Sequence, residues 1–225
     1  PENWKLAVNN ENFRKSIVHA FNRMPALATS DRIDPESLKN NTITPNAFAS
    51  ASKDYTYYEG LAAYTDGDNF DEALAAEYKA AAIDELTAAG ATFPVKMLMC
   101  YNPTSANWAQ ECQVVEQQIE TVLGADYVDI IIQAGPETGF LGAIRRTGNY
   151  AFMKCNWGAD FSDAYAFIVD PFGDSSKYSF IYRSEDPETQ AYYQEYLDLV
   201  NAALAINGDE EARYETFAEA EAVLL

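Results

Sequence analysis

Apolar side chains recur three or four positions apart along several stretches of the chain, which predicts amphipathic helices. The spacing places Leu74 and Leu204 on the inward faces of their helices. A polar stretch rich in Pro and Asn, from about residue 25 to 71, is expected to run over the surface with short turns of structure. The predicted helices cover residues 12–23, 71–89, 105–124, 186–207 and 209–225.

Short apolar or β-branched runs in the middle of the chain have the length of buried strands. They are residues 94–101, 127–133 and 150–156, and the helix at 105–124 and a shorter one at 138–147 lie between them. Strands that alternate with helices favour a parallel sheet joined by right-handed crossovers. The pattern therefore predicts an α/β fold with a mainly parallel sheet flanked by helices.

The chain carries a large excess of negative charge. It has 35 acidic and 15 basic residues, which gives a formal net charge of -20. Such a surface repels phosphate groups, so we expect no nucleic acid among the partners, and docking to anionic lipid is disfavoured. Hydrophobic residues make up 48% of the chain, which is enough for a real core.

The cysteines and the histidine do not indicate a metal centre. Cys100, Cys112 and Cys155 have neither CxxC spacing nor a cluster of His residues beside them. They lie in apolar runs or on an apolar helix face, so we expect all of them to be buried as small hydrophobic side chains. His19 falls opposite the apolar face of its helix and is expected to be solvated. We expect no metal and no cofactor.

The sequence also lacks the motifs of common enzymes. It has no GxSxG elbow, no HExxH and no P-loop. Asp160 and Asp163 are carboxylates of the kind that acid–base catalysis uses, but nothing else in the sequence completes a mechanism. An α/β enzyme that uses these two residues is therefore the less favoured alternative.

The loop Asn156–Asp163 follows the third predicted strand and is the best candidate for a ligand site. Ligands of open parallel sheets bind beyond the carboxyl ends of the strands. Gly158 allows a close backbone approach, and Trp157 offers a flat apolar surface with one N–H donor. A carboxylate at Asp160 pairs well with an ammonium group. The residues alone leave two roles open for Asp160, ligand anchor or helix cap, and they favour the cap for Asp163.

The segment Tyr150–Phe167 resembles the signature of the oligopeptide- and dipeptide-binding proteins of ABC importers. That signature is a strand followed by Trp-x-x-Asp-Tyr-x-Asp-Pro and then a Phe. Asn12–Arg23 and Arg213–Leu224 resemble two helices of the same family, and the matches occur in family order over nearly the whole chain. Asn22 and Ala164 depart from the pattern, in place of an aspartate and a proline.

The resemblance implies that residues 1–225 form a single lobe of a two-lobe solute-binding protein, with a periplasmic-binding-protein-like fold. The matching segments belong to the second lobe of the family, which is inserted between two crossings from the first. Because the chain also begins and ends abruptly, we expect a fragment of a longer protein, with Pro1 and Leu225 close together in space. Family members clamp an extended peptide between their two lobes.

The resemblance assigns a role to the candidate loop. The aspartate that matches Asp160 binds the peptide's α-ammonium group, and backbone groups around the residues that match Trp157, Gly158 and Ala159 pair with the peptide main chain. The ligand-binding residues are therefore expected to be Asp160, Trp157, Gly158 and Ala159, without catalysis.

The resemblance also implies the partners, a short peptide and the membrane permease of an ABC importer. It implies a monomer outside the cytoplasm, in the periplasm or as a lipoprotein at the cell surface. Two alternatives stay open, a different solute such as a nickel chelate or a sugar on the same scaffold, and a module that mainly docks the permease.

Overall fold

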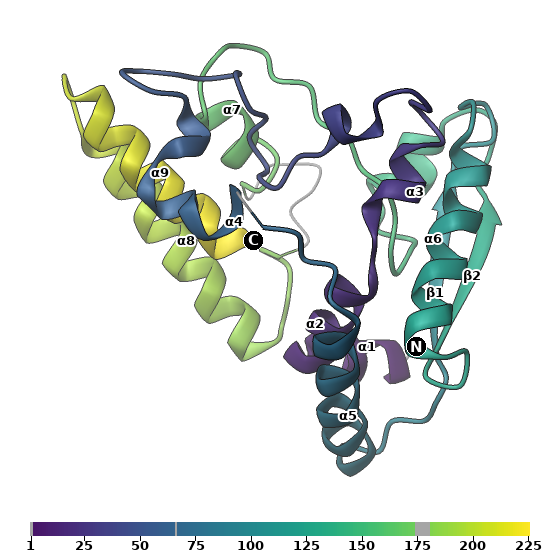
Figure 1. Cartoon of the computed structure of the whole chain (residues 1–225). Helices are drawn as coiled ribbons and strands as arrows, with labels where there is room; N and C mark the ends of the chain where they lie inside the picture. Colours follow the sequence, from purple (N-terminus) through teal and green to yellow (C-terminus); the bar gives the residue numbers. More distant parts are fainter. Residues whose placement is uncertain (1, 66, 174–180) are drawn as a thin grey trace. The chain divides into compact units, whose positions relative to one another are not determined.

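The computed structural model shows two units, each assembled from separated stretches of the chain (Figure 1). It describes residues 2–65, 67–173 and 181–225. Unit 1 comprises the chain up to Lys39 together with Asp68–Cys155, and unit 2 comprises Asn40–Gly67 together with Asn156–Leu225. That residues 1–225 form one inserted lobe stays a prediction, and the expected closeness of Pro1 to Leu225 lies outside the described residues.

Two parallel strands form the sheet of unit 1. β1 (Val95–Tyr101) pairs with β2 (Val128–Ala134) along its whole length, from Val95 opposite Val128 to Tyr101 opposite Ala134. The helix between them, α6 (Trp108–Leu123), packs against both strands, as Figure 1 shows. The predicted strand–helix–strand order and the parallel pairing are confirmed.

The third predicted strand is wrong in extent. Phe152 forms a single parallel bridge with Met99, and the rest of residues 150–156 has no strand structure. The N–H groups of Ala151 and Phe152 both donate to the Leu98 carbonyl, at 2.8 and 3.2 Å. Because two successive donors share one acceptor, the backbone does not advance along β1, and the ladder stops there.

The other helices differ from the predicted ones mainly at their ends. The helix predicted at 138–147 is a π-helical turn, η4 (Leu141–Arg145). The polar stretch after α3 contains short turns, as expected: η1 (Pro35–Leu38), η2 (Tyr55–Tyr57), η3 (Glu59–Leu61) and α4 (Ala62–Thr65). The remaining helices are α1 (Glu2–Asn9), α2 (Glu11–Ala20), α3 (Arg23–Leu27), α5 (Glu72–Ala88), α7 (Tyr165–Ile168), α8 (Pro187–Ala205) and α9 (Glu210–Leu224).

Helix α5 turns a row of small residues inward. Its buried side chains are Ala75, Ala82 and Leu86, whereas Leu74, which the spacing placed inward, is 36% exposed. Alanines allow α5 to lie close against α2, so packing favours that face over the one that carries the larger side chain. Leu204 in α8 is likewise 47% exposed, and Ala203 takes the buried position.

The cysteine and histidine predictions need correction. Cys100 and Cys112 are buried as expected, but Cys155 is exposed because the chain has left the strand before reaching it. His19 is half-buried rather than solvated. Its Nδ1 lies 2.6 Å from the carbonyl oxygen of Asn69, and its ring stacks on Tyr78 of α5.

Helices α8 and α9 pack side by side in unit 2, and the segment containing η2 and η3 packs along α9 (Figure 1). Aromatic side chains fill the contact: Tyr55 and Tyr58 pack edge-to-face on Tyr214, with ring centroids 5.6 and 6.1 Å away. Glycine at position 60 is required there, because a Cβ would lie 2.7 Å from the backbone nitrogen of Glu219. The core of unit 2 therefore joins residues far apart in sequence.

A fully buried carboxylate, Glu221 of α9, holds the segment before η2 in place. Its Oε1 accepts from the N–H groups of Ile43 and Thr44, at 2.7 and 3.0 Å, and its Oε2 accepts from the Thr44 hydroxyl at 2.7 Å. Burial raises the pKa of Glu221, although these hydrogen bonds act in the opposite direction. The folded state therefore binds a proton at Glu221 more tightly than the unfolded state does.

This raised pKa predicts a pH-dependent stability. The stabilising effect of protonation is complete below the ordinary pKa of 4.5 and is lost as the pH rises through the higher pKa of the folded state. Relative to Glu221→Gln, which does not titrate, the wild type should gain stability as the pH falls through that window. Urea unfolding of both proteins across the window measures the difference, with the exposed Glu219→Gln as control, and parallel pH profiles would contradict it.

The close contact at Gly60 predicts a second stability effect. Gly60→Ala should lower the free energy of unfolding by about 1–3 kcal/mol, because the added methyl meets α9 backbone that has no room to move. Gly142→Ala is the matched control, since a Cβ there meets nothing within 4 Å. Equal urea midpoints for the two variants would refute the packing argument.

Candidate ligand-binding site

The loop that precedes α7 is fastened at several points within unit 2. The Trp157 Nε1–H donates to the carbonyl of Ala166 at 2.7 Å, which ties the start of the loop to α7. The Ser162 hydroxyl donates to the carbonyl of Phe48 at 2.8 Å, and the Asp163 N–H donates to the carbonyl of Phe161 at 3.1 Å. The residues between these ties are therefore held as a short, closed loop.

Asp163 has the structural role that the sequence favoured for it. Its Oδ1 accepts from the N–H of Tyr165, the first residue of α7, at 2.9 Å. Both of its carboxylate oxygens also lie 2.8 Å from Nη2 of Arg213 in α9. A carboxylate with these partners has little capacity left for a ligand.

Asp160 has neither a helix-capping hydrogen bond nor an ion pair of the kind that Asp163 makes. Its side chain is exposed, and its carboxylate makes no hydrogen bond or ion pair with any residue that the structure describes. α7 begins only at Tyr165, so Asp160 does not cap it, and that alternative is wrong. Asp160 is therefore a carboxylate without a partner in the described part of the chain, on a loop whose flanks are fixed.

The backbone beside Asp160 is equally free. Within the described part of the chain, the N–H and carbonyl groups of Gly158 and Ala159 have no hydrogen-bond partner. Gly158 is exposed, and a Cβ there would meet nothing within 4 Å, so the described residues do not themselves require a glycine. The loop thus presents one carboxylate and a short run of unpaired backbone groups.

Asp170 lies just after α7. The sequence gave no reason to connect it with the candidate site. Burial raises the pKa of its carboxyl group, and the negative charge of Asp160 raises it further. A cation bound at Asp160 would offset that repulsion. Arg213 was also missed, although it is an isolated cation among the many acidic residues of α9, which is a visible signal.

The loops at residues 102–105 and 134–137 also follow predicted strands, β1 and β2, and so were expected at the same edge of the sheet as the candidate loop. They belong to unit 1, whereas residues 156–163 belong to unit 2.

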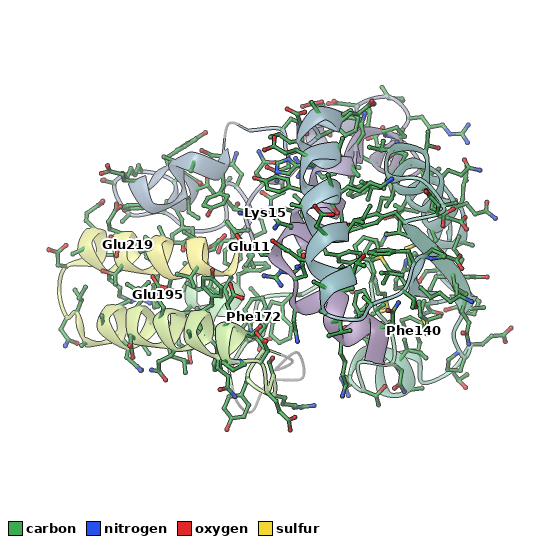
Figure 2. The ribbon with its side chains drawn as sticks, turned by 90° about the horizontal axis from the view of Figure 1, so that it is seen from below. Glu11, Lys15, Phe140, Phe172, Glu195 and Glu219 are labelled. Carbon is green, nitrogen blue, oxygen red and sulfur yellow. The ribbon has the colours of Figure 1, made fainter. Side chains whose placement is uncertain are left out.

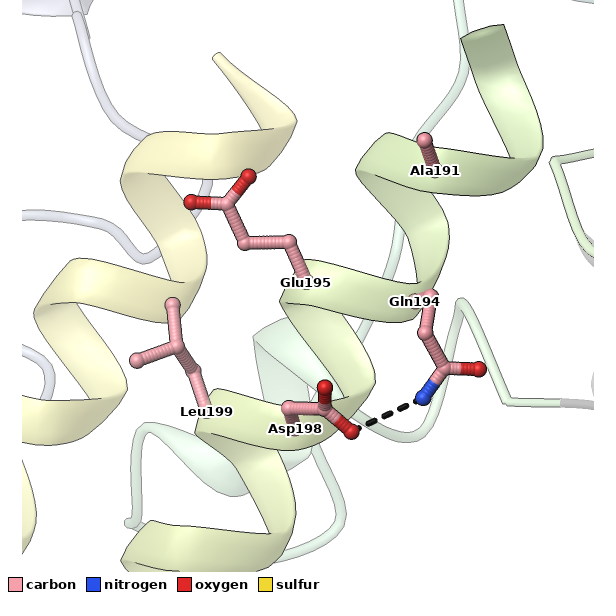
Figure 3. A pocket seen from close by; sticks show the side chains of 5 residues that line it. All are labelled: Ala191, Gln194, Glu195, Asp198 and Leu199. Atoms are coloured by element: carbon pink, nitrogen blue, oxygen red, sulfur yellow. Dashed lines mark hydrogen bonds between the residues drawn. The ribbon is translucent and has the colours of Figure 1, made fainter. Parts of the chain in front are cut away.

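A groove on α8 in unit 2 is a second candidate for binding (Figure 3). Figure 3 shows Glu195 and Leu199 on the side of α8 that faces α9, and Gln194 and Asp198 on the other side. The Gln194 amide donates to Asp198 at 2.8 Å, so these two side chains satisfy each other. Figure 2 shows that α8 and α9 both carry acidic side chains, among them Glu195 and Glu219. The groove has the character of a solvated acidic helix face.

Metal and membrane features were searched within the described residues. No group of three or more His, Cys, Asp or Glu side chains there is arranged to hold a metal ion. None of the described helices combines the length and the apolar character needed to cross a lipid bilayer.

No family model matches the sequence, but individual relatives do. The oligopeptide-binding protein SarA of Streptococcus gordonii is 27% identical over 98% of this chain. The chain is similar to oligopeptide-binding proteins. This confirms the resemblance seen in the sequence motifs. The aligned part is 37% of the length of SarA, so the chain spans well under half of that oligopeptide-binding protein.

Solved structures of oligopeptide-binding proteins and their relatives share the fold. A peptide-binding protein of a peptide ABC transporter superposes with a TM-score of 0.72 at 22% identity, over 98% of this chain and 88% of that one. Haemophilus influenzae OppA, solved with the peptide RPPGFSPFR, superposes with a TM-score of 0.60 at 22% identity, over 95% of this chain and 37% of OppA. The predicted α/β, periplasmic-binding-protein-like fold with a parallel sheet flanked by helices is confirmed.

The electrostatic link between the two aspartates is directly testable. Asp160→Asn should lower the pKa of Asp170, because it removes a nearby negative charge, but burial should still hold that pKa above its ordinary value. Titration of the Asp170 side-chain carbon by NMR measures the change. Glu195→Gln on α8 is the control, and an unchanged Asp170 titration in Asp160→Asn would refute the link.

Proposed function

We propose that this chain is part of an extracytoplasmic solute-binding protein that captures a short peptide and passes it to an ABC importer, without catalysis. The observation that carries the proposal is the carboxylate of Asp160, which has no partner among the described residues, beside backbone groups of Gly158 and Ala159 that are likewise unpaired there. The similarity to oligopeptide-binding proteins over 98% of the chain supports it.

The chemistry of this loop suits the amino-terminal end of a peptide. An α-ammonium group forms charge-assisted hydrogen bonds with a carboxylate, and these are stronger than bonds between neutral groups. Free backbone N–H and carbonyl groups beside the carboxylate add contacts to the peptide main chain, as in strand addition. Both kinds of contact are independent of the peptide's side chains, so the loop selects for a free amino terminus rather than for a sequence.

The rest of the proposed protein follows from the same similarity. We expect a second lobe to supply most of the remaining contacts and to close over the ligand by a hinge. The isolated chain should then bind peptides weakly, because it provides only part of the contact surface. We expect a monomer, in the periplasm or lipid-anchored at the cell surface, that docks a membrane permease.

Asp160→Asn should weaken the binding of a short peptide to the full-length protein by tenfold to a hundredfold, corresponding to roughly 1.5–3 kcal/mol for a hydrogen bond between charged groups. N-acetylating the peptide should have a similar effect, since it removes the partner charge. The two changes together should cost little more than either alone. Calorimetric titration of the four combinations measures this coupling.

Glu219→Gln is the matched control for charge, because it removes one exposed carboxylate from α9 in the same unit (Figure 2). Its affinity should equal that of the wild type. If neither Asp160→Asn nor acetylation changes the peptide affinity, the proposed function is wrong. Mass spectrometry of the ligand that co-purifies with the full-length protein distinguishes a peptide from a metal chelate or a sugar.

A further inference from the structure

We propose that Arg213 is a positioning residue for the ligand site: by neutralising and fixing Asp163, it makes Asp160 the single anchor for a peptide's amino terminus. This inference rests on the proposed function. It concerns the register in which a peptide binds and the selectivity of the site for a free amino terminus. The similarity to other proteins gives no information on either.

The contact between the two side chains is close and sheltered. Nη2 of Arg213 lies 2.8 Å from each oxygen of Asp163, and the two side chains are only 23% and 19% exposed. The guanidinium group is itself held over the rings of Phe217 and Tyr214, 4.9 and 5.5 Å from their centroids. The cation therefore reaches the loop from a rigid helix rather than from a free surface side chain.

Asp163 joins most of the hydrogen bonds that shape the loop. Its N–H donates to Phe161, its carboxylate accepts from Tyr165, and its carbonyl accepts from the N–H of Ala166 at 3.0 Å. Ala166 is also the residue whose carbonyl accepts from Trp157. Asp160 thus lies between two fastened points, one at Trp157 and one at Asp163, and the second depends on Arg213.

Charge gives Arg213 a second effect on the same site. Asp160 and Asp163 are two carboxylates on one short loop, and an ammonium group is attracted to either. The ion pair with Arg213 satisfies Asp163, whereas Asp160 has no ion-pair partner in the described part of the chain. Without that cation, Asp163 would compete for the ligand, and the peptide would have two possible registers.

The test compares affinities for a free and an N-acetylated form of one peptide, in the full-length protein. Arg213→Met keeps much of the stem that packs on Phe217 but removes the charge, so that Asp163 becomes a second anchor. Asp160→Asn should then reduce the preference for the free form about tenfold less in Arg213→Met than in the wild type, a difference of about 1.4 kcal/mol. Arg213→Lys restores a cation and should recover part of the dependence on Asp160. Adding Asp163→Asn to Arg213→Met removes the second anchor and should restore the full dependence on Asp160.

A variant that is merely less stable provides the control. Ala202→Gly weakens α8 in the same unit at an exposed position, and it should leave the ratio of the two affinities unchanged. The indole N–H signal of Trp157 in NMR spectra gives an independent readout, and it should shift in Arg213→Met but not in Ala202→Gly.

The outcomes separate the two proposals. If the wild type prefers the free peptide and Asp160→Asn reduces that preference equally with and without Arg213→Met, Arg213 has no positioning role, while the proposed function stands. Equal losses of both affinities in Arg213→Met, with the dependence on Asp160 unchanged, also overturn the inference, because they show a structural role only. If the wild type itself shows no preference, both proposals are wrong.

Discussion

The ion pair between Asp163 and Arg213 determines what the loop before α7 presents to solvent. Both oxygens of Asp163 lie 2.8 Å from the guanidinium nitrogen, and the helix-starting N–H of Tyr165 binds the same carboxylate. A carboxylate satisfied in this way has little capacity left for a ligand cation. Among the residues that the structure describes, Asp160 has no hydrogen-bond or ion-pair partner, and the neighbouring backbone groups of Gly158 and Ala159 are unpaired as well.

Carboxylates with specific hydrogen-bond partners also stabilise other parts of unit 2. Glu221 binds the backbone of Ile43 and Thr44 from inside the core, and Glu211 accepts from the Tyr58 hydroxyl at 2.6 Å. These carboxylates act as acceptors for donors on a segment that lies far away in sequence. The acidic residues behind the net charge of -20 therefore differ in role: some are structural, others are solvated, and Asp160 has no partner among the described residues.

Local patterns predicted the elements better than their contacts. The periodicities indicated α2, α5, α6, α8 and α9, and the strand–helix–strand order indicated the parallel pairing of β1 with β2. The local patterns were wrong where the burial of a side chain depends on the element that packs against it. Leu74 is exposed because α5 packs through its alanines, and Cys155 is exposed because the chain leaves β1 after one bridge at Phe152.

The sequence by itself determined the order of the elements, the position of the Trp157–Asp160 loop and the resemblance to peptide-binding proteins, because each depends on residues that are close together in the chain. Only the tertiary structure decided which aspartate is free. The deciding residue, Arg213, lies 50 positions after Asp163, and a contact at that separation leaves no local pattern. An isolated arginine on an acidic helix is visible in the sequence, but the carboxylate that it neutralises depends on how α9 packs against the loop.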